Sequence, residues 1–504
     1  MKYYMRDMAK VCFFCAMEEL VTEILRRTTV KGQQVNIVAN PDGFLRREDT
    51  RNEIELQSGV KVMPCSQLEL RIIFETDCKD EQDTIWLFII DNIDTLLPDI
   101  RQHSYQSRLN MKDLFITYYN QGLNLKLLNY KTALQLFRNK PIGRLNKEGT
   151  RLSVKEAQEE YGENGNDISI IKWNLSSEQI DWHKPKDTID NVSEYIIKAA
   201  KQGLYEQIED ELAVINNSFQ KDIDNRYFSQ MLLATRPKVV HKILPYMLRT
   251  YGVEDKVALI VVDGMTYWQY MLLRDELSII GIETHDDVTY SWLPSITMLS
   301  RQAIFRGEKP RRDYKQSPRN ERNLWLNFWF AHGYNDITAR YVYNKEEEVP
   351  FMDDSLTKLA YVTVTLDEYM HSAANMKQLY RDTEDWAKEF APVIKNIYDH
   401  GFEIIITADH GSVPSHAWGN LTSQEKTYLY EDGSRGKRHS IYTQPFAVEA
   451  FCNSHIDIEE SLLVHNNFIC WRDNRCFVNK DCITHGGSNM LEMVVPFITI
   501  KKKV

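Results

Sequence analysis

The sequence lacks any apolar run long enough to cross a membrane. A spanning helix needs about 20 consecutive apolar residues, and no stretch of the 504 residues reaches that length. The early run VCFFCAMEELV is interrupted by Glu18 and Glu19, and no small-residue cleavage site follows it. We therefore expect a protein without a membrane segment that works in the cytoplasm.

Cysteine is also sparse, with eight residues in the whole chain. So few thiols in so long a chain do not form a dense disulfide framework, and we expect them to be reduced. Cys12 and Cys15 form a CxxC pair, but their segment resembles an apolar helix and no second CxxC completes a zinc site. Core packing is the interpretation that we favour for this pair.

Positive charge is not in excess, because the formal net charge is −11. This balance excludes a protein whose entire surface binds nucleic acid, although it leaves room for a local basic patch. One such patch lies between Arg306 and Arg322, where seven Lys or Arg residues accompany three acidic ones. The segment is either a solvated loop or a contact surface for a phosphate-bearing substrate.

Three regions differ in their residue patterns, and 43% apolar residues suffice to fill their cores. Residues 1–120 contain short apolar runs followed by helical patterns, which predict a small α/β domain. Residues 121–250 predict a mainly helical connector or partner-binding region. Residues 251–504 alternate strand and helix patterns, and the run KVALIVVDG is typical of a strand buried on both faces. The expected fold class is α/β, with a mostly parallel sheet covered by helices in this last region.

Acidic, hydroxyl and imidazole side chains follow apolar runs throughout the last region. Because the carboxyl ends of parallel strands share one edge of a sheet, we expect these side chains to converge there. Three Asp, three His and one Thr supply oxygen and nitrogen ligands that suit two divalent cations, most naturally Zn²⁺. The seven residues are Asp263, Thr297, Asp367, His371, Asp409, His410 and His485.

Each of these residues also has an ordinary structural explanation when it is taken alone. Asp263 ends an apolar run, His485 could be a loop histidine, and Thr297 could simply cap the helix predicted from MLSRQAIFRG.

Asp367 and His371 are four residues apart, so on a helix they would share one face, as paired metal ligands do. A threonine at a helix N-terminus beside a dication has a stabilised alkoxide, which a nucleophile attacking phosphorus needs.

Taken together, the order Asp, Thr, DxxxH, DH, His resembles the alkaline phosphatase superfamily over about residues 255–498, and within it a PglZ domain. The motifs that carry the resemblance are VVDG, LPSIT with SRQAIFRG, LDEYMH, ADHG, and THGG before EMVVPF. The resemblance implies that one metal, which activates the nucleophile, is bound by Asp263, Thr297, Asp409 and His410. It implies that a second metal is bound by Asp367, His371 and His485. Thr297 would be phosphorylated transiently, and a metal-bound hydroxide would then release the phosphoryl group from it.

PglZ domains are associated with phage-defence systems of the BREX type and with certain response regulators. The resemblance therefore implies a hydrolase with two divalent metals, Zn²⁺ or Mn²⁺, that acts as a phosphodiesterase on nucleotides or oligonucleotides. The first 120 residues lack the acidic cluster of a phosphoacceptor site, so the defence-type arrangement fits better, with other defence proteins bound through the N-terminal and helical regions. Two alternatives stay open, a phosphomonoesterase with the same site and a non-catalytic scaffold of a defence complex.

Basic residues near these motifs are candidates for substrate contacts. Arg301 lies one helical turn after Thr297 and could either face the site or cap internal packing. The segment GSRGKRHS, residues 433–440, could hold a nucleotide, although its composition fits a disordered surface segment at least as well. The substrate-binding residues that we predict are Arg301, Arg311, Arg312, Lys437 and His439.

Overall fold

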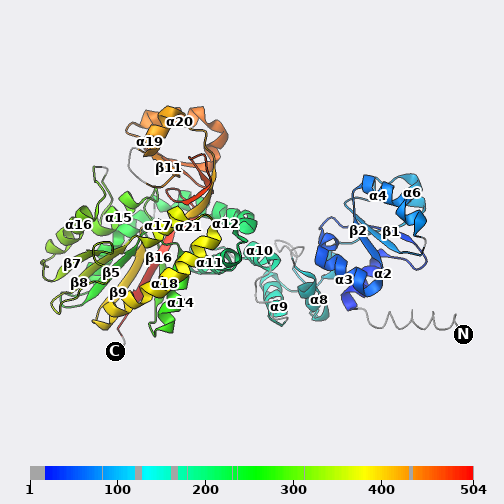
Figure 1. Ribbon diagram of the computed structural model, residues 1–504, viewed down its shortest axis with the longest axis horizontal. Helices are drawn as coiled ribbons and strands as arrows, with labels where there is room; N and C mark the ends of the chain where they lie inside the picture. Colours follow the sequence, from blue (N-terminus) through cyan, green and yellow to red (C-terminus); the bar gives the residue numbers. More distant parts are fainter. Residues whose placement is uncertain are drawn as a thin grey trace. The chain divides into compact units, whose positions relative to one another are not determined.

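The computed structural model describes residues 18–81, 83–119, 128–160, 168–178, 180–229, 231–234, 237–311, 313–430 and 435–502. The predicted CxxC pair and Arg312 lie outside these residues. The chain divides into two compact units, Met1–Ser177 and Glu178–Val504 (Figure 1).

The first unit contains a four-stranded sheet in the order β2-β3-β1-β4, and all of its strand pairs are parallel. Every residue of β1 and β3 is buried, because helices cover both faces of the sheet and the strands are almost wholly apolar. The α/β architecture predicted for this region is therefore confirmed. Its strands are β1 (Val35–Ala39), β2 (Lys61–Pro64), β3 (Trp86–Ile90) and β4 (Tyr105–Arg108), and its longer helices are α2 (Glu19–Thr28), α3 (Glu48–Ser58), α4 (Gln67–Glu75), α8 (Tyr130–Arg138), α9 (Lys147–Glu160) and α10 (Ile168–Ser177).

The boundary between the units, after Ser177, falls inside the region predicted to be one helical connector, residues 121–250. Helices α11 (Pro185–Gln202), α12 (Glu209–Asp222) and α13 (Ile243–Thr250) belong to the second unit. The reason is packing, since α11 contacts two helices of the second unit's main sheet, α14 (Tyr267–Ile279) and α18 (Met376–Asp399).

The second unit is built on a six-stranded sheet in the order β6-β16-β9-β5-β8-β7. The pairs β5–β8, β5–β9 and β7–β8 are parallel, whereas β16 is antiparallel to β9 and to β6. The prediction of a mostly parallel sheet covered by helices is thus confirmed (Figure 1). The strands are β5 (Val257–Val262), β6 (His285–Tyr290), β7 (Ala339–Tyr343), β8 (Lys358–Thr363), β9 (Glu403–Ala408) and β16 (Val494–Ile500), and the further helices are α15 (Thr297–Arg306), α16 (Pro318–Phe330), α17 (Thr365–Ser372) and α21 (Met490–Met493).

A long insertion, residues 412–484, separates β9 from β16. It forms two three-stranded sheets, β14-β10-β15 and β11-β13-β12, with a core of its own around Tyr442, Phe451, Trp471 and Phe477. Its elements are β10 (Val413–Ala417), α19 (Ser423–Tyr430), β11 (His439–Ile441), α20 (Pro445–Ser454), β12 (Leu462–His465), β13 (Phe468–Trp471), β14 (Arg475–Cys476) and β15 (Cys482–Thr484).

The insertion corrects one expectation from the sequence. Over its described residues, 435–440, the segment GSRGKRHS is not a disordered surface stretch, because Arg438 and His439 are fully buried. His439 begins β11, which pairs with β13. The buried Arg438 carries ion-pair and hydrogen-bond partners, which composition alone cannot reveal.

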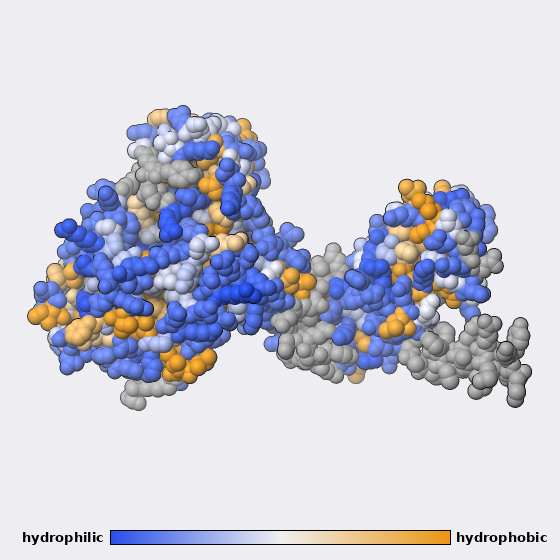
Figure 2. All heavy atoms as spheres, viewed as in Figure 1, coloured by the Kyte–Doolittle hydropathy of each residue, from blue (hydrophilic) through white to orange (hydrophobic). Residues whose placement is uncertain are grey.

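Among the described residues, no helix combines the length and the apolar character that a bilayer span requires. Figure 2 shows a mainly hydrophilic face on the second unit, with apolar side chains gathered near β7 and β8. Phe330, Ile337 and Phe351 are among the large apolar side chains that are exposed in this unit.

Candidate metal centre

The candidate ligands follow three neighbouring strands of the six-stranded sheet. Asp263 comes directly after β5, Asp409 and His410 come directly after β9, and α17 begins two residues after β8. Because β5 runs parallel to both β8 and β9, the three strands end at the same edge of the sheet. The side chains predicted to converge at this edge do meet there.

Thr297 enters this edge from the first turn of α15. The N-cap of the helix is Ile296, so Thr297 is the first helical residue rather than the cap. Its Oγ lies 3.0 Å from Nε2 of His410 and 3.5 Å from Oδ1 of Asp263. The hydroxyl therefore sits at the positive end of a helix and beside two candidate metal ligands.

One group of possible metal ligands consists of Asp263, Asp367 and His410, with one donor atom of each lying within 4.8 Å of the others. All three side chains are buried. Asp409 adjoins the group, since its Oδ2 is 3.7 Å from Nε2 of His410. The backbone N–H groups of Gly264 and His410 donate to Oδ1 of Asp409 at 3.2 and 3.0 Å, which fixes that carboxylate.

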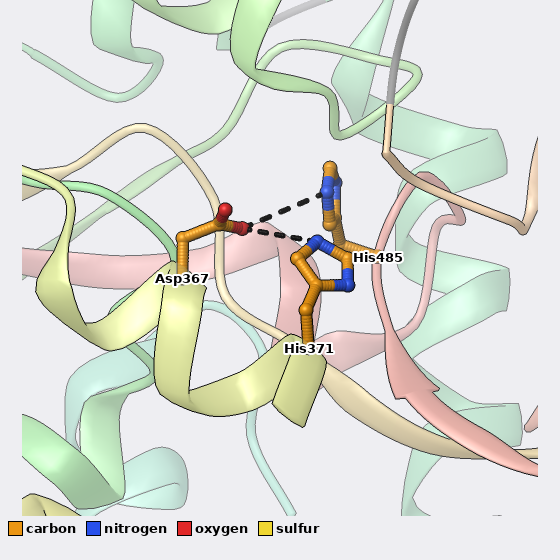
Figure 3. A group of neighbouring side chains, drawn as sticks. All are labelled: Asp367, His371 and His485. Carbon is orange, nitrogen blue, oxygen red and sulfur yellow. Dashed lines mark ion pairs between the residues drawn. The ribbon is translucent and has the colours of Figure 1, made fainter. Parts of the chain in front are cut away.

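A second group consists of Asp367, His371 and His485, whose side chains point toward one another (Figure 3). Oδ1 of Asp367 is 3.3 Å from Nε2 of His371 and 4.0 Å from Nε2 of His485. The four-residue spacing on α17 brings the first two together, as predicted from the sequence. His485 belongs to a different segment, the loop that follows β15.

Backbone carbonyls set the orientation of two imidazoles. Nδ1 of His485 lies 3.0 Å from the carbonyl oxygen of Ser295, and Nδ1 of His410 lies 2.9 Å from that of Gly411. A proton on each Nδ1 donates to the carbonyl, which leaves the lone pair of Nε2 facing the cluster. This is the arrangement that metal-ligating histidines adopt.

Four buried atoms of the cluster have no hydrogen-bond partner among the residues that the structure describes. They are Oδ1 of Asp367, Nε2 of His371, Oδ2 of Asp409 and Nε2 of His485. A buried polar atom without a partner costs about 1–3 kcal/mol, so four in one place require a compensating group. Carboxylate oxygens and imidazole nitrogens are donors that Zn²⁺ and related divalent cations accept. The side chains therefore fit divalent cations.

The electrostatics of the cluster agree with this fit. Burial, followed by the carboxylates of Asp409 and Asp367, raises the pKa of Asp263 well above its usual range. Burial and the neighbouring ring of His410 lower the pKa of His485 well below its usual range, so the imidazole is neutral. Burial opposes ionisation of Asp367, but contact with His371 and the other imidazoles holds its pKa well below the usual range. Crowded carboxylates and neutral imidazoles are what a cation stabilises.

Arg301, for which the sequence left two interpretations, lies beside the cluster in a double ion pair. Its Nη1 is 2.7 Å from Oδ2 of Asp263, and its Nη2 is 2.7 Å from Oε2 of Glu321 on α16. All three side chains are buried. Burial alone would lower the pKa of Arg301, but Glu321 and Asp263 raise it well above the usual value. Arg301 thus orients Asp263, and Glu321 is a residue that the sequence did not indicate.

The other predicted substrate contacts lie in different surroundings. The backbone N–H of Lys437 donates to the carbonyl oxygen of His485 at 3.1 Å. His439 packs closely against Gly486. A Cβ atom added to Gly486 would lie 2.6 Å from Nδ1 of His439. Arg311 is exposed on the loop between α15 and α16 and lines a cleft beside α15. Arg435 reaches the cluster directly, with Nη1 3.2 Å from Oδ2 of Asp367.

Two further buried residues, Ser295 and Glu492, join the loop of Thr297 to the loop of His485. Oγ of Ser295 donates to the carbonyl of Gly487 at 2.8 Å and accepts from the N–H of Gly486 at 3.2 Å. Oε1 of Glu492 accepts from the N–H of Gly487 at 2.7 Å and from Nε of Arg438 at 3.0 Å. We call these contacts the Ser295–Glu492 network. Glu492 also completes a capping box on α21, and the pattern N-x-x-E is the sequence signal that could have identified it.

Comparisons with known proteins bear on the same region. A family model described as the BREX system PglZ alkaline phosphatase-like domain matches residues 245–500, just over half of the chain. No match was found among curated protein sequences. Similar solved structures include phosphonoacetate hydrolase from Sinorhizobium meliloti 1021, with 13% identity, a TM-score of 0.32, and coverage of 49% of this chain and 90% of that one. Murine ectonucleotide pyrophosphatase/phosphodiesterase 5 shows 10% identity, a TM-score of 0.33, and coverage of 49% and 88%.

Proposed function

The chain belongs to the PglZ family of alkaline phosphatase-like domains, a family of phosphoester hydrolases, and from this premise we propose that it cleaves phosphodiesters with Thr297 as the nucleophile. The substrates are nucleotides or oligonucleotides. The cofactors are two divalent cations, Zn²⁺ or Mn²⁺, whose ligands are the seven predicted residues. The setting that we propose is bacterial phage defence in the cytoplasm, with partner proteins bound through residues 1–250.

One observation carries this proposal. Seven side chains from segments spread over more than 200 residues meet at one sheet edge, and four of their buried oxygen and nitrogen atoms have no hydrogen-bond partner among the described residues. A structural polar cluster satisfies its own hydrogen bonds. Donor atoms left unpaired around a common centre instead suit cations and the phosphoryl group that the cations bind.

The residues divide between two cations. Asp263, Thr297, Asp409 and His410 would hold one of them, and Asp367, His371 and His485 would hold the other. When bound, the cations neutralise charge on the phosphoryl oxygens and lower the pKa of a coordinated hydroxyl.

The protein's own residues position the reacting atoms. Oγ of Thr297 gives up its proton to solvent and attacks phosphorus, so that the new Thr297–phosphorus bond forms while the bond to the leaving oxygen breaks, and that oxygen takes a proton from solvent to become the alcohol. The first turn of α15 favours the negative charge that develops on this oxygen. Water then attacks the phosphorus of this Thr297 phosphodiester, the bond between phosphorus and the Thr297 oxygen breaks, the phosphomonoester product leaves, and the threonine oxygen takes back a proton. Arg301 holds Asp263 in place throughout.

The pairing of the Arg301 guanidinium with two carboxylates supports a diester rather than a monoester substrate. Monoesterases place a free cation against the dianionic phosphate. Both sides of the Arg301 guanidinium are already paired, with Asp263 and with Glu321. A phosphodiester carries one negative charge fewer and needs less compensation.

The proposal is tested by hydrolysis of bis-nitrophenyl phosphate and mononitrophenyl phosphate, each with and without chelator. We expect the diester to be the better substrate, and we expect chelation to abolish turnover until Zn²⁺ or Mn²⁺ is restored. Thr297→Ala should lower kcat by about three orders of magnitude or more, whereas Thr297→Ser should keep part of the activity because a hydroxyl remains.

Two outcomes would contradict the proposal. Preference for the monoester would favour the phosphomonoesterase alternative. A Thr297→Ala variant that retains both metals and the full biological effect would favour the scaffold alternative.

A further inference from the structure

A cleft of about 1050 Å³ lies beside the first turn of α15 in the second unit. Met298 and Leu299, the two residues after Thr297, line it together with Leu293 and Pro294. One wall comes from the loop between α15 and α16, and the other comes from the insertion, including the turn between β12 and β13. The cleft therefore lies between two segments and is lined by residues on both sides of Thr297 in the chain, whereas Thr297 itself is not part of its lining.

The charge of the cleft is opposite to that of the whole chain. Lys309, Arg311 and Lys315 line it, and none of its lining residues within the described part of the chain is acidic. The chain as a whole carries a net charge of −11. A groove of this kind attracts an anionic ligand.

Aromatic side chains line the same cleft. The rings of Phe228 and His465 are stacked, with centroids 3.9 Å apart and planes 12° from parallel. Trp292 is half-buried and is supported from behind by the edge of His241, at 5.5 Å between centroids. Tyr314 is also half-buried, and its hydroxyl has no hydrogen-bond partner within the described part of the chain. Such rings offer surfaces for the faces of bases.

We propose that this cleft binds a single strand of nucleic acid, with its bases on the aromatic side chains and its phosphates on the three cations. This inference rests on the proposed function, because it places the scissile phosphodiester at Thr297. Alternating stacking surfaces and basic side chains are the features by which proteins hold single strands, whose bases are exposed. The volume lies at the upper end of the roughly 300–1,000 Å³ of small-molecule pockets, so the cleft has room for a short strand.

Binding to the full chain can be measured with a fluorescent oligothymidylate in the presence of chelator, so that no cleavage occurs. Tyr314→Ala removes one stacking surface and should weaken binding by about 5- to 150-fold. Lys309→Glu and Lys315→Glu should weaken it as well, and each cation removed from a phosphate should reduce the slope of log affinity against log salt by about 0.7. Lys395→Glu, which changes an exposed lysine of α18, is the matched control and should leave binding and turnover unchanged.

Activity provides a second readout that a loss of fold would not reproduce. In the metal-loaded enzyme, the cleft variants should lose more turnover on a single-stranded oligonucleotide than on bis-nitrophenyl phosphate, which is too small to fill the cleft. Circular dichroism should show the same helix and strand content in all variants.

Several results would overturn the inference. They are wild-type affinity in all three cleft variants, equal affinity for duplex and single-stranded DNA, or equal affinity for polyglutamate, which carries charge without bases. If the wild type hydrolyses bis-nitrophenyl phosphate but shows any of these results, the cleft assignment fails and the proposed function stands. If it hydrolyses no diester, the proposed function fails, whatever the cleft binds.

Discussion

Single residues around the site carry most of the unusual chemistry of this chain, and His241 is an example outside the ligand cluster. Its side chain is 2% exposed and lies edge-on to Trp292. Burial, with smaller contributions from Lys242 and Lys309, lowers the pKa of His241 to about 4. An exposed histidine in the unfolded chain titrates near 6.5. The folded protein therefore binds fewer protons at this position between the two values.

The consequence is a stability that falls as pH falls from about 6.5 towards 4. His241→Phe keeps an aromatic ring against Trp292 and removes the titration. The difference in unfolding free energy between pH 7 and pH 4 should then shrink by up to about 3 kcal/mol relative to the wild type. Urea unfolding followed by tryptophan fluorescence measures this difference. His285→Phe, at an exposed position of β6, is the control, and an identical pH dependence in all three proteins would contradict the assignment.

The candidate ligands that meet at the sheet edge could be selected from the sequence because most of them are chemically distinctive residues that follow an apolar run. The environment of Arg301 could not, since its partner Glu321 belongs to another helix and only packing of α15 against α16 brings them together. The same holds for Ser295, a small hydroxyl that is unremarkable in sequence and becomes specific only through its contacts with the loop of His485.

At the level of secondary-structure elements, the site depends on two loops, that of Thr297 and that of His485. The Ser295–Glu492 network connects them. Both Glu492 and Arg438 are fully buried, and removing one partner of such a pair costs about 3–5 kcal/mol. The loss would also release the N–H of Gly487, two residues after His485. We expect Glu492→Ala to weaken the metal site by about 10- to 100-fold, as changes in residues that orient metal ligands do.

Competition between the protein and a chromophoric chelator for Zn²⁺ measures this effect. Glu492→Gln keeps an acceptor oxygen, so it should retain part of the Zn²⁺ affinity that Glu492→Ala loses. Glu425→Gln breaks another ion pair of the same insertion, with His455, and should leave the metal affinity unchanged. Wild-type metal affinity in Glu492→Ala would show that the network does not position His485.

The elements themselves were only partly predictable. Apolar runs such as that of β5 identified the strands, but their order in the sheet depends on long-range pairing that the sequence does not display. The insertion was harder still, because Tyr442, Trp471 and Phe477 form one core from separate short segments. Polar stretches between them concealed that core and made residues 435–440 resemble a surface segment.

At the scale of the whole molecule, the seven candidate ligands and the proposed substrate cleft all lie in the second unit. Helices α11 and α12 belong to that unit, although the sequence pattern assigned them to a separate connector. Asn216 of α12 accepts a hydrogen bond from the N–H of Met490 at 3.0 Å and donates to the carbonyl of Arg472 at 2.8 Å. Removing these helices would expose apolar surface and unpaired polar groups.

Two truncations test this assignment. A chain of residues 178–504 should fold and hydrolyse diesters at a rate similar to that of the full chain. A chain of residues 251–504, which begins at the boundary predicted from sequence, should be poorly folded. Circular dichroism and thermal melting check both, and a stable, active shorter chain would contradict the packing role of α11 and α12.

The proposed function requires that the clustered carboxylates and imidazoles hold two metal ions around one phosphoryl position. Anomalous diffraction from crystals of the full chain grown with Zn²⁺ tests it most directly. We expect two peaks, about 3.5–4 Å apart as in two-metal sites. One should lie beside Asp263, Asp409 and His410, with Thr297 near it, and the other beside Asp367, His371 and His485. Loss of the second peak in His371→Ala would support the division of ligands. A map of the wild type without peaks at this sheet edge would contradict the claim.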